Sequence, residues 1–126
     1  MNAFSVFILP GGLFLATAAF GLWVSLTGRP YNGLLFNVHK LLALACVVLT
    51  LIPLVGLLKA SPAHATALAL LALAALCVIV LFATGAVMSI GTFARALVLL
   101  AHRIALVLLP LSLVVSVYLI NRGVAV

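Results

Sequence analysis

The chain of 126 residues contains no aspartate and no glutamate. Its six lysine and arginine residues therefore have no acidic side chain to pair with. Without a carboxylate, a Ser-His-Asp triad cannot form, and a buried acid cannot couple proton movement to transport. Enzymes and transporters that depend on an acidic side chain are excluded.

Cysteine is also scarce, and both copies, Cys46 and Cys77, lie inside apolar runs. No Cys-x-x-Cys pair occurs, so neither a zinc knuckle nor a covalently attached c-type haem is expected. A net charge of +6 can indicate a protein that binds nucleic acid. In this chain, however, the basic residues are few and are scattered around apolar runs. We expect no nucleic-acid partner, and anionic lipid headgroups or a bound anionic cofactor fit this charge better.

Hydrophobic residues make up 69% of the chain. A helix needs about 20 apolar residues to cross a bilayer, and backbone groups in lipid must bond within the segment. The sequence predicts an all-α integral membrane protein, a four-helix up-down bundle in one transmembrane domain covering residues 1–126. The expected helices span about residues 4–26, 34–58, 63–90 and 93–120.

The first apolar run favours a retained helix over a cleaved signal peptide. No lysine or arginine precedes this run, and its apolar character continues to Leu26. The chain is rich in alanine and leucine, and its expected links are short. This minimal design favours a bacterial inner (plasma) membrane, with the lipid bilayer as the first partner.

The two halves of the chain share a histidine motif. The pattern Gly-x10-His-(Lys/Arg) occurs twice, each time across a helix-link-helix pair. When one copy is shifted onto the other, His39 corresponds to His102, and Lys40 corresponds to Arg103. The remaining matches are mostly between leucine and alanine, which coincide by chance in so apolar a chain. The pattern leaves open an internal repeat of a two-helix unit.

The two histidines are expected at similar depth on one side of the membrane. Helices 34–58 and 93–120 run in the same direction, because one full up-and-down crossing separates them. His39 lies about 7.5 Å into its helix at 1.5 Å per residue, and His102 is near the start of its helix. Two imidazoles at one level of a bundle can bind one metal, and imidazole suits iron. The candidate cofactor is one haem b, with His39 and His102 as metal ligands.

The positive charges give this hypothesis a second support. Lys40 and Arg103 lie within apolar runs, where an unpaired charge costs on the order of 2.5–3.5 kcal/mol at the helix centre and less near the interface. Haem carries two propionates, which would supply the missing anions, whereas snorkelling to lipid phosphate is the alternative. The candidate cofactor-binding residues beside the histidines are Lys40, Arg103, Arg95, Asn32, Arg29 and Tyr31.

The stretches "FNVHKLLALACVVL" and "LLAHRIALVLL" resemble the histidine-bearing helices of small membrane b-type cytochromes, the four-helix cytochrome b / ferric-reductase-like group. The resemblance covers about a third of the chain. It implies that His39 and His102 are axial ligands with Lys40 and Arg103 beside them, in a protein that passes electrons across or along the membrane. Larger members usually carry four histidines for two haems, whereas this chain has two in its spans.

A single haem near one membrane face cannot alone carry electrons across the bilayer. The resemblance therefore implies an electron-transfer subunit rather than a self-contained enzyme. Its expected partners are other membrane or redox subunits, with a quinone as a further candidate.

Two other functions are compatible with the sequence. In a cofactor-free structural or assembly subunit, the histidines would be interhelical hydrogen-bond donors worth about 0.6–2 kcal/mol each. In a small transporter or channel, Lys40 and Arg103 would line an anion path. The third histidine, His64, opens the helix at 63–90 on the opposite side of the membrane, and we expect a helix-end residue there.

Overall fold

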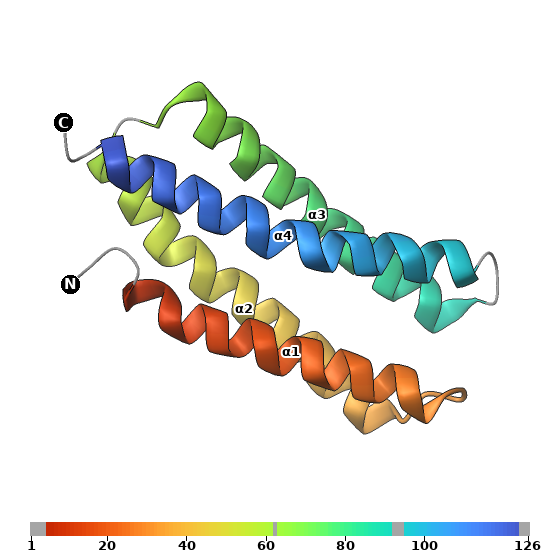
Figure 1. Ribbon diagram of the computed structural model, residues 1–126. Coiled ribbons are helices and arrows are strands. Elements are labelled where there is room, and N and C mark those ends of the chain that lie inside the picture. Colours follow the sequence, from red (N-terminus) through yellow and green to blue (C-terminus); the bar gives the residue numbers. More distant parts are fainter. Residues whose placement is uncertain (1–4, 62, 92–94, 124–126) are drawn as a thin grey trace. The chain divides into compact units, whose positions relative to one another are not determined.

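The computed structural model describes residues 5–61, 63–91 and 95–123. In these ranges a short 3-10 turn, η1 (Ser5–Phe7), precedes four α-helices: α1 (Ile8–Thr27), α2 (Gly33–Ala60), α3 (Ala65–Ile90) and α4 (Arg95–Gly123). The chain divides into two compact units, residues 1–57 and 58–126. The first unit contains α1 and all but the last residues of α2, and the second contains α3 and α4; they correspond to the α1–α2 hairpin and the α3–α4 hairpin (Figure 1).

The all-α prediction is confirmed, and the helix ends differ from expectation by a few residues. Helix α2 is longer than the expected 34–58 at both ends, and α4 continues past residue 120 to Gly123. Helix α3 begins at Ala65 rather than at residue 63, since positions 63 and 64 are not helical. The expected starts of the first and fourth helices, Phe4 and Phe93, lie outside the described residues.

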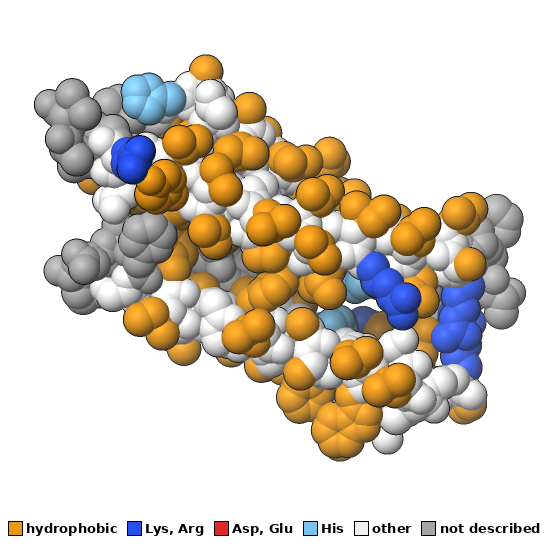
Figure 2. Space-filling view, viewed as in Figure 1, with side chains coloured by type: hydrophobic (Ala, Val, Ile, Leu, Met, Phe, Trp, Pro, Cys, Tyr) orange, Lys and Arg blue, Asp and Glu red, His pale blue; other side chains and the backbone are white. Residues whose placement is uncertain are grey.

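Within the described residues, four helices are long and apolar enough to cross a membrane. Large hydrophobic side chains along them are open to the surroundings, with Ile8 73%, Leu34 74% and Ile90 87% exposed. Hydrophobic side chains dominate the visible face of each hairpin in Figure 2. Apolar surface exposed along whole helices of this length fits contact with lipid chains rather than water. These features indicate an integral membrane protein.

In the α1–α2 hairpin, one stripe of α1 faces α2. Pro10, Thr17 and Val24 are buried and lie seven residues apart. The thiol of Cys46 donates to the Pro10 carbonyl at 3.5 Å, and the His39 ring lies 2.9 Å from the Thr17 carbonyl. Seven residues forward in α1 correspond to seven residues backward in α2, so the two helices are antiparallel and in register.

The α3–α4 hairpin contains most of the buried side chains among the described residues, and these are mainly small. Small side chains let membrane helices approach closely, so that packing and weak interhelical contacts replace the hydrophobic effect. Helices α3 and α4 pack against each other along their length (Figure 1). The small buried residues are Ala67, Ala74 and Cys77 in α3, and Ala105, Ser112 and Ser116 in α4.

Hydroxyl groups within the helices bond to their own backbone. Ser112 donates to the Leu108 carbonyl at 2.8 Å, and Ser116 donates to the Ser112 carbonyl at 2.6 Å. Each bond joins a residue to the one four positions earlier, which satisfies the hydroxyl without a partner from outside the helix. This arrangement suits helices that water does not reach.

The link after α1 needs a glycine at position 28. Gly28 has φ 72° and ψ −167°, a backbone conformation that is essentially restricted to glycine. It reverses the chain after Thr27 and directs it into α2. The link therefore depends on a residue without a Cβ atom.

We expect Gly28→Ala to destabilise the protein by about 1–3 kcal/mol, because the alanine Cβ strains this conformation. Gly56→Ala is the control: Gly56 lies inside α2, and a Cβ there meets nothing within 4 Å. This control should gain up to about 1 kcal/mol from helix propensity. Unfolding in detergent, followed by circular dichroism, measures both. Equal stability of the two variants would contradict the role of Gly28.

Candidate functional site

His39 is tethered to the helix that precedes it. Its ring lies half-buried in α2, and its Nδ1 atom is 2.9 Å from the backbone carbonyl oxygen of Thr17 in α1. A carbonyl oxygen can only accept a hydrogen bond, so Nδ1 must carry the proton and donate. In the neutral ring, the lone pair is then on Nε2, which makes Nε2 the nitrogen able to bind a metal.

Gly21 provides the space in which the His39 ring lies. A Cβ atom at position 21 would be 2.8 Å from Cε1 and 3.2 Å from Nδ1 of His39. Real Cβ atoms essentially never approach another atom so closely as 2.8 Å. The ring therefore lies directly on the α1 backbone, and this close approach allows its bond to Thr17.

His102 is tethered in the same way through a side chain. Its Nδ1 atom is 2.8 Å from Oγ1 of Thr84 in α3. The Thr84 hydroxyl lies 2.6 Å from the Val80 carbonyl and 3.2 Å from the Leu81 carbonyl, and when it donates its one proton there, Oγ1 accepts from the imidazole. In that arrangement Nδ1 of His102 is the protonated nitrogen, and in the neutral ring Nε2 carries the lone pair.

The two histidines occupy the same position within their hairpins. His39 lies twelve residues past Thr27, the last residue of α1, and His102 lies twelve residues past Ile90, the last residue of α3. In both hairpins the ring reaches back to the preceding helix through Nδ1. Metal-binding histidines commonly donate the proton of the other ring nitrogen to a fixed acceptor, which sets their tautomer and orientation. Each hairpin thus presents a pre-oriented imidazole.

Aromatic rings accompany the cations of the α1–α2 hairpin. The Lys40 ammonium lies 4.0 Å from the centre of the Phe36 ring, and Arg29 lies 5.3 Å from that of Tyr31. Tyr31 and Phe36 stack on each other at 5.8 Å with 14° between their planes. Arg29, Tyr31, Phe36 and Lys40 therefore form one column of two rings between two cations, which we call the cation column. Each cation–ring contact is worth about 0.5–1 kcal/mol at an exposed site.

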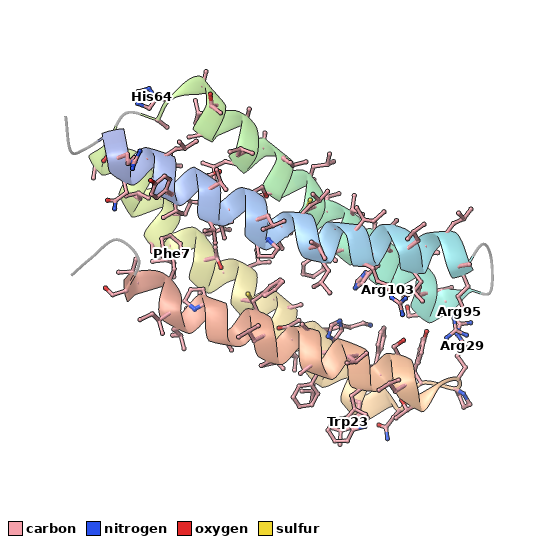
Figure 3. All side chains as sticks on the ribbon, viewed as in Figure 1. Phe7, Trp23, Arg29, His64, Arg95 and Arg103 are labelled. Carbon is pink, nitrogen blue, oxygen red and sulfur yellow. The ribbon has the colours of Figure 1, made fainter. Side chains whose placement is uncertain are left out.

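The cations of the α3–α4 hairpin are all on α4, and two of them, Arg95 and Arg122, lie at its ends. Arg95 is the first residue of α4, and Arg103 is exposed on the same helix nearer to this end than to the other (Figure 3). Arg122 lies 4.8 Å from the ring centre of Tyr118 in the last turn of α4. His64 is exposed just before α3, at the end of the hairpin far from Arg95 (Figure 3).

Asn32, predicted as a cofactor-binding residue, caps helix α2. Its side-chain oxygen accepts from the backbone N–H groups of Leu34 at 3.0 Å and Leu35 at 3.3 Å, and its carbonyl accepts from Phe36. This arrangement satisfies backbone donors that a helix start leaves without intrahelical partners. With Oδ1 engaged in the cap, only the side-chain N–H2 group can serve a further ligand as donor.

Sequence reasoning identified both histidines but none of the residues that hold them. Gly21 and the Thr17 carbonyl receive His39, whereas Thr84 and the Val80 carbonyl receive His102. The shift along the chain that superposes His39 on His102 also superposes Gly21 on Thr84 and position 17 on position 80. Because glycine and threonine are dissimilar, this correspondence does not stand out in the sequence.

Among the described residues, no group of three or more histidine, cysteine or acidic side chains could hold a metal ion. A metal bound by two histidines would need further donors from a cofactor, such as the ring nitrogens of a tetrapyrrole. Comparisons of the chain with protein-family models, with curated proteins and with solved structures gave no match.

We expect Gly21→Ala to detach His39 from the Thr17 carbonyl, because the new Cβ would overlap the ring. The variant should lose about 1–3 kcal/mol of stability from overpacking. Gly12→Ala is the control, since Gly12 lies in the same helix and a Cβ there meets nothing within 4 Å. Thermal unfolding in detergent compares them, and a Gly21→Ala variant as stable as the control would contradict this packing.

For Asn32, the cap predicts which substitutions are tolerated. Asn32→Ala should lower stability by about 0.5–2 kcal/mol, whereas Asn32→Asp and Asn32→Ser should change it little because both residues cap helices well. Thermal unfolding of the three variants is the measurement. If Asn32→Ser is as damaging as Asn32→Ala, the side-chain oxygen has a role other than capping.

Proposed function

We propose that this chain is a membrane electron-transfer protein or subunit that binds one b-type haem through His39 and His102. The observation that carries the proposal is the tether on each imidazole: Nδ1 lies within hydrogen-bond distance of an oxygen atom of the preceding helix in both hairpins, at 2.9 Å and 2.8 Å. Such a bond fixes the tautomer that directs Nε2 to a metal and raises the basicity of the ligand. The donor set of two neutral imidazoles fits a low-spin haem iron.

The position of the histidines along the chain supports a shared ligand. If the four helices cross the membrane in turn, the α1–α2 and α3–α4 links lie on one side of it. His39 is about 9 Å past the start of α2 and His102 about 10.5 Å past the start of α4, at 1.5 Å per residue. We propose that the two hairpins form a four-helix up-down bundle with the haem between α2 and α4.

The charges near the histidines suit the carboxylates of such a cofactor. Lys40 and Arg103 each follow a histidine, and Arg95 stands at the amino end of α4, where the helix dipole also favours an anion. In the cation column, the aromatic faces attract Arg29 and Lys40 but accept hydrogen bonds less well than a carboxylate does. The propionates of a haem would supply carboxylate acceptors, with Tyr31 beside them.

A bound haem would supply one-electron chemistry, and the protein would supply ligands, charge and an apolar environment. The chain lacks acidic side chains for acid-base chemistry of its own. We therefore propose an electron-transfer subunit that works beside a quinone or another redox subunit, in a bacterial inner membrane. The matching tethers at corresponding positions support descent of the two hairpins from one duplicated unit.

A second function is favoured by the same hydrogen bonds. Both histidines already join two helices of their hairpin, which is what polar side chains do as interhelical contacts in cofactor-free membrane proteins. In this case the chain would be a structural or assembly subunit. The two functions differ in whether Nε2 of each histidine has a metal to bind.

The test is a reduced-minus-oxidised absorption spectrum of the full chain, expressed with added haem and purified in detergent. We expect a b-type signal that is lost in His39→Ala and in His102→Ala. His64→Ala is the matched control and should keep the signal, because His64 is exposed at the far end of its hairpin. A colourless wild-type protein would reject the haem and leave the structural function.

A further inference from the structure

Position 21 in α1 and position 84 in α3 are equivalent places in the two hairpins. Each lies six residues before the end of its helix, and each contacts the histidine of the following helix. One place holds Gly21 and the other holds Thr84. The two positions correspond but their residues differ. The hairpins can therefore be compared as two ways of holding a histidine ring against the preceding helix.

In the α1–α2 hairpin, the histidine reaches the backbone directly. Gly21 has no side chain, so the His39 ring lies against the helix with Cε1 only 2.8 Å from where a Cβ would be. Its Nδ1 then meets the carbonyl of Thr17, four residues before Gly21, at 2.9 Å. Thr17 uses its own hydroxyl elsewhere, on the Leu13 carbonyl at 2.7 Å.

In the α3–α4 hairpin, a hydroxyl group lies between the histidine and the backbone carbonyl. Oγ1 of Thr84 accepts from Nδ1 of His102 at 2.8 Å and donates at 2.6 Å to the carbonyl of Val80, again four residues earlier. Positions 17 and 80 have the same separation in the chain as the two histidines. The two tethers therefore lead to equivalent backbone carbonyls. His39 contacts the Thr17 carbonyl directly, whereas His102 is connected to the Val80 carbonyl through the Thr84 hydroxyl.

We infer that Gly21 and Thr84 are positioning residues that hold the two histidines in the Nδ1-protonated tautomer, Gly21 by admitting the ring to a backbone carbonyl and Thr84 by relaying it to one. The inference rests on the proposed function in one respect only: it assumes that Nε2 of each histidine is a ligand of haem iron. The two tethers differ in kind. The Nδ1 atom of His39 meets a backbone group that no substitution removes, whereas the Nδ1 atom of His102 meets the hydroxyl of a side chain.

Because of this difference, a substitution at position 84 can change the tautomer of His102 while the histidine itself is kept. Thr84→Val keeps the branched shape and removes the hydroxyl, so Nδ1 of His102 loses the Thr84 oxygen as an acceptor. Thr84→Ser keeps the hydroxyl. Thr84→Gly recreates the arrangement of Gly21, and it opens the Val80 carbonyl to the ring of His102.

The first measurement is the protonation of the ring nitrogens by 15N NMR in the full chain, prepared without haem in detergent micelles. In wild type we expect protonated Nδ1 and unprotonated Nε2 for both histidines at a pH where the rings are neutral. Thr84→Val should shift His102 toward the Nε2-protonated form, while Thr84→Ser and Thr84→Gly keep the wild-type pattern. His39 should stay unchanged in all three variants and serves as the internal reference.

Thr50→Val is the matched control for loss of a helical hydroxyl. Thr50 makes the same bond to the residue four positions earlier, at 2.7 Å to the Cys46 carbonyl, in α2. It should leave the His102 signal at its wild-type position. Helix content and elution volume equal to those of Thr50→Val would establish that Thr84→Val is folded.

The second measurement is haem affinity of the same variants. Loss of such a supporting bond commonly weakens metal binding about 10- to 100-fold, so Thr84→Val should bind haem more weakly by this factor, with Thr84→Ser close to wild type. The reduction potential of Thr84→Val should rise, because a less basic imidazole stabilises the oxidised iron less.

The two measurements separate the inference from the proposed function. An Nδ1-protonated His102 in folded Thr84→Val would overturn the inference, whatever the protein does with haem. So would a wild-type His102 protonated on Nε2. If the tautomers change as expected and no variant takes up haem, the tether is established and the haem function is rejected.

Discussion

Helices that cross a lipid bilayer must satisfy their polar groups within the protein, because no water is present to do so. The serine and threonine hydroxyls follow this constraint by bonding to carbonyls one turn earlier, as Ser116 and Thr50 do. The two histidines follow it across helices, through Thr17 and Thr84. Within the described residues, no buried side-chain nitrogen or oxygen lacks a hydrogen-bond partner. The hydrogen bonds of the two histidines are thus points at which the two helices of each hairpin are joined.

Charged side chains near lipid also need partners within the protein, and this chain provides them in an unusual way. It has six basic residues and no acidic one, so an acidic side chain, the usual partner of a cation near lipid, is missing. In the described residues, aromatic faces take part of this role: Phe36 for Lys40, Tyr31 for Arg29 and Tyr118 for Arg122. A ring face attracts a cation but accepts hydrogen bonds poorly. An anion that also accepts hydrogen bonds, such as a propionate or a phosphate, would complement these cations.

The two hairpins solve the tethering of a histidine with different residues and the same geometry. Glycine works in one because the ring can then lie on the helix backbone, and threonine works in the other because its hydroxyl passes the bond on. What corresponds between the hairpins is a carbonyl position and a ring position rather than a side chain. The two hairpins therefore correspond in geometry more closely than they do in sequence.

The sequence by itself determined the helical class, the number of long apolar segments and the approximate ends of the helices, because length and hydropathy decide whether a segment can cross a bilayer. It also identified His39 and His102, since polar residues are rare enough in such a chain to be noticed individually. Only the tertiary structure decided which atoms hold the two rings. Gly21 contributes by the absence of a side chain, and Thr84 resembles any helical threonine until its partner is known. Asn32 also acquired its role from the structure, because a helix cap depends on where the backbone turns rather than on the charge nearby.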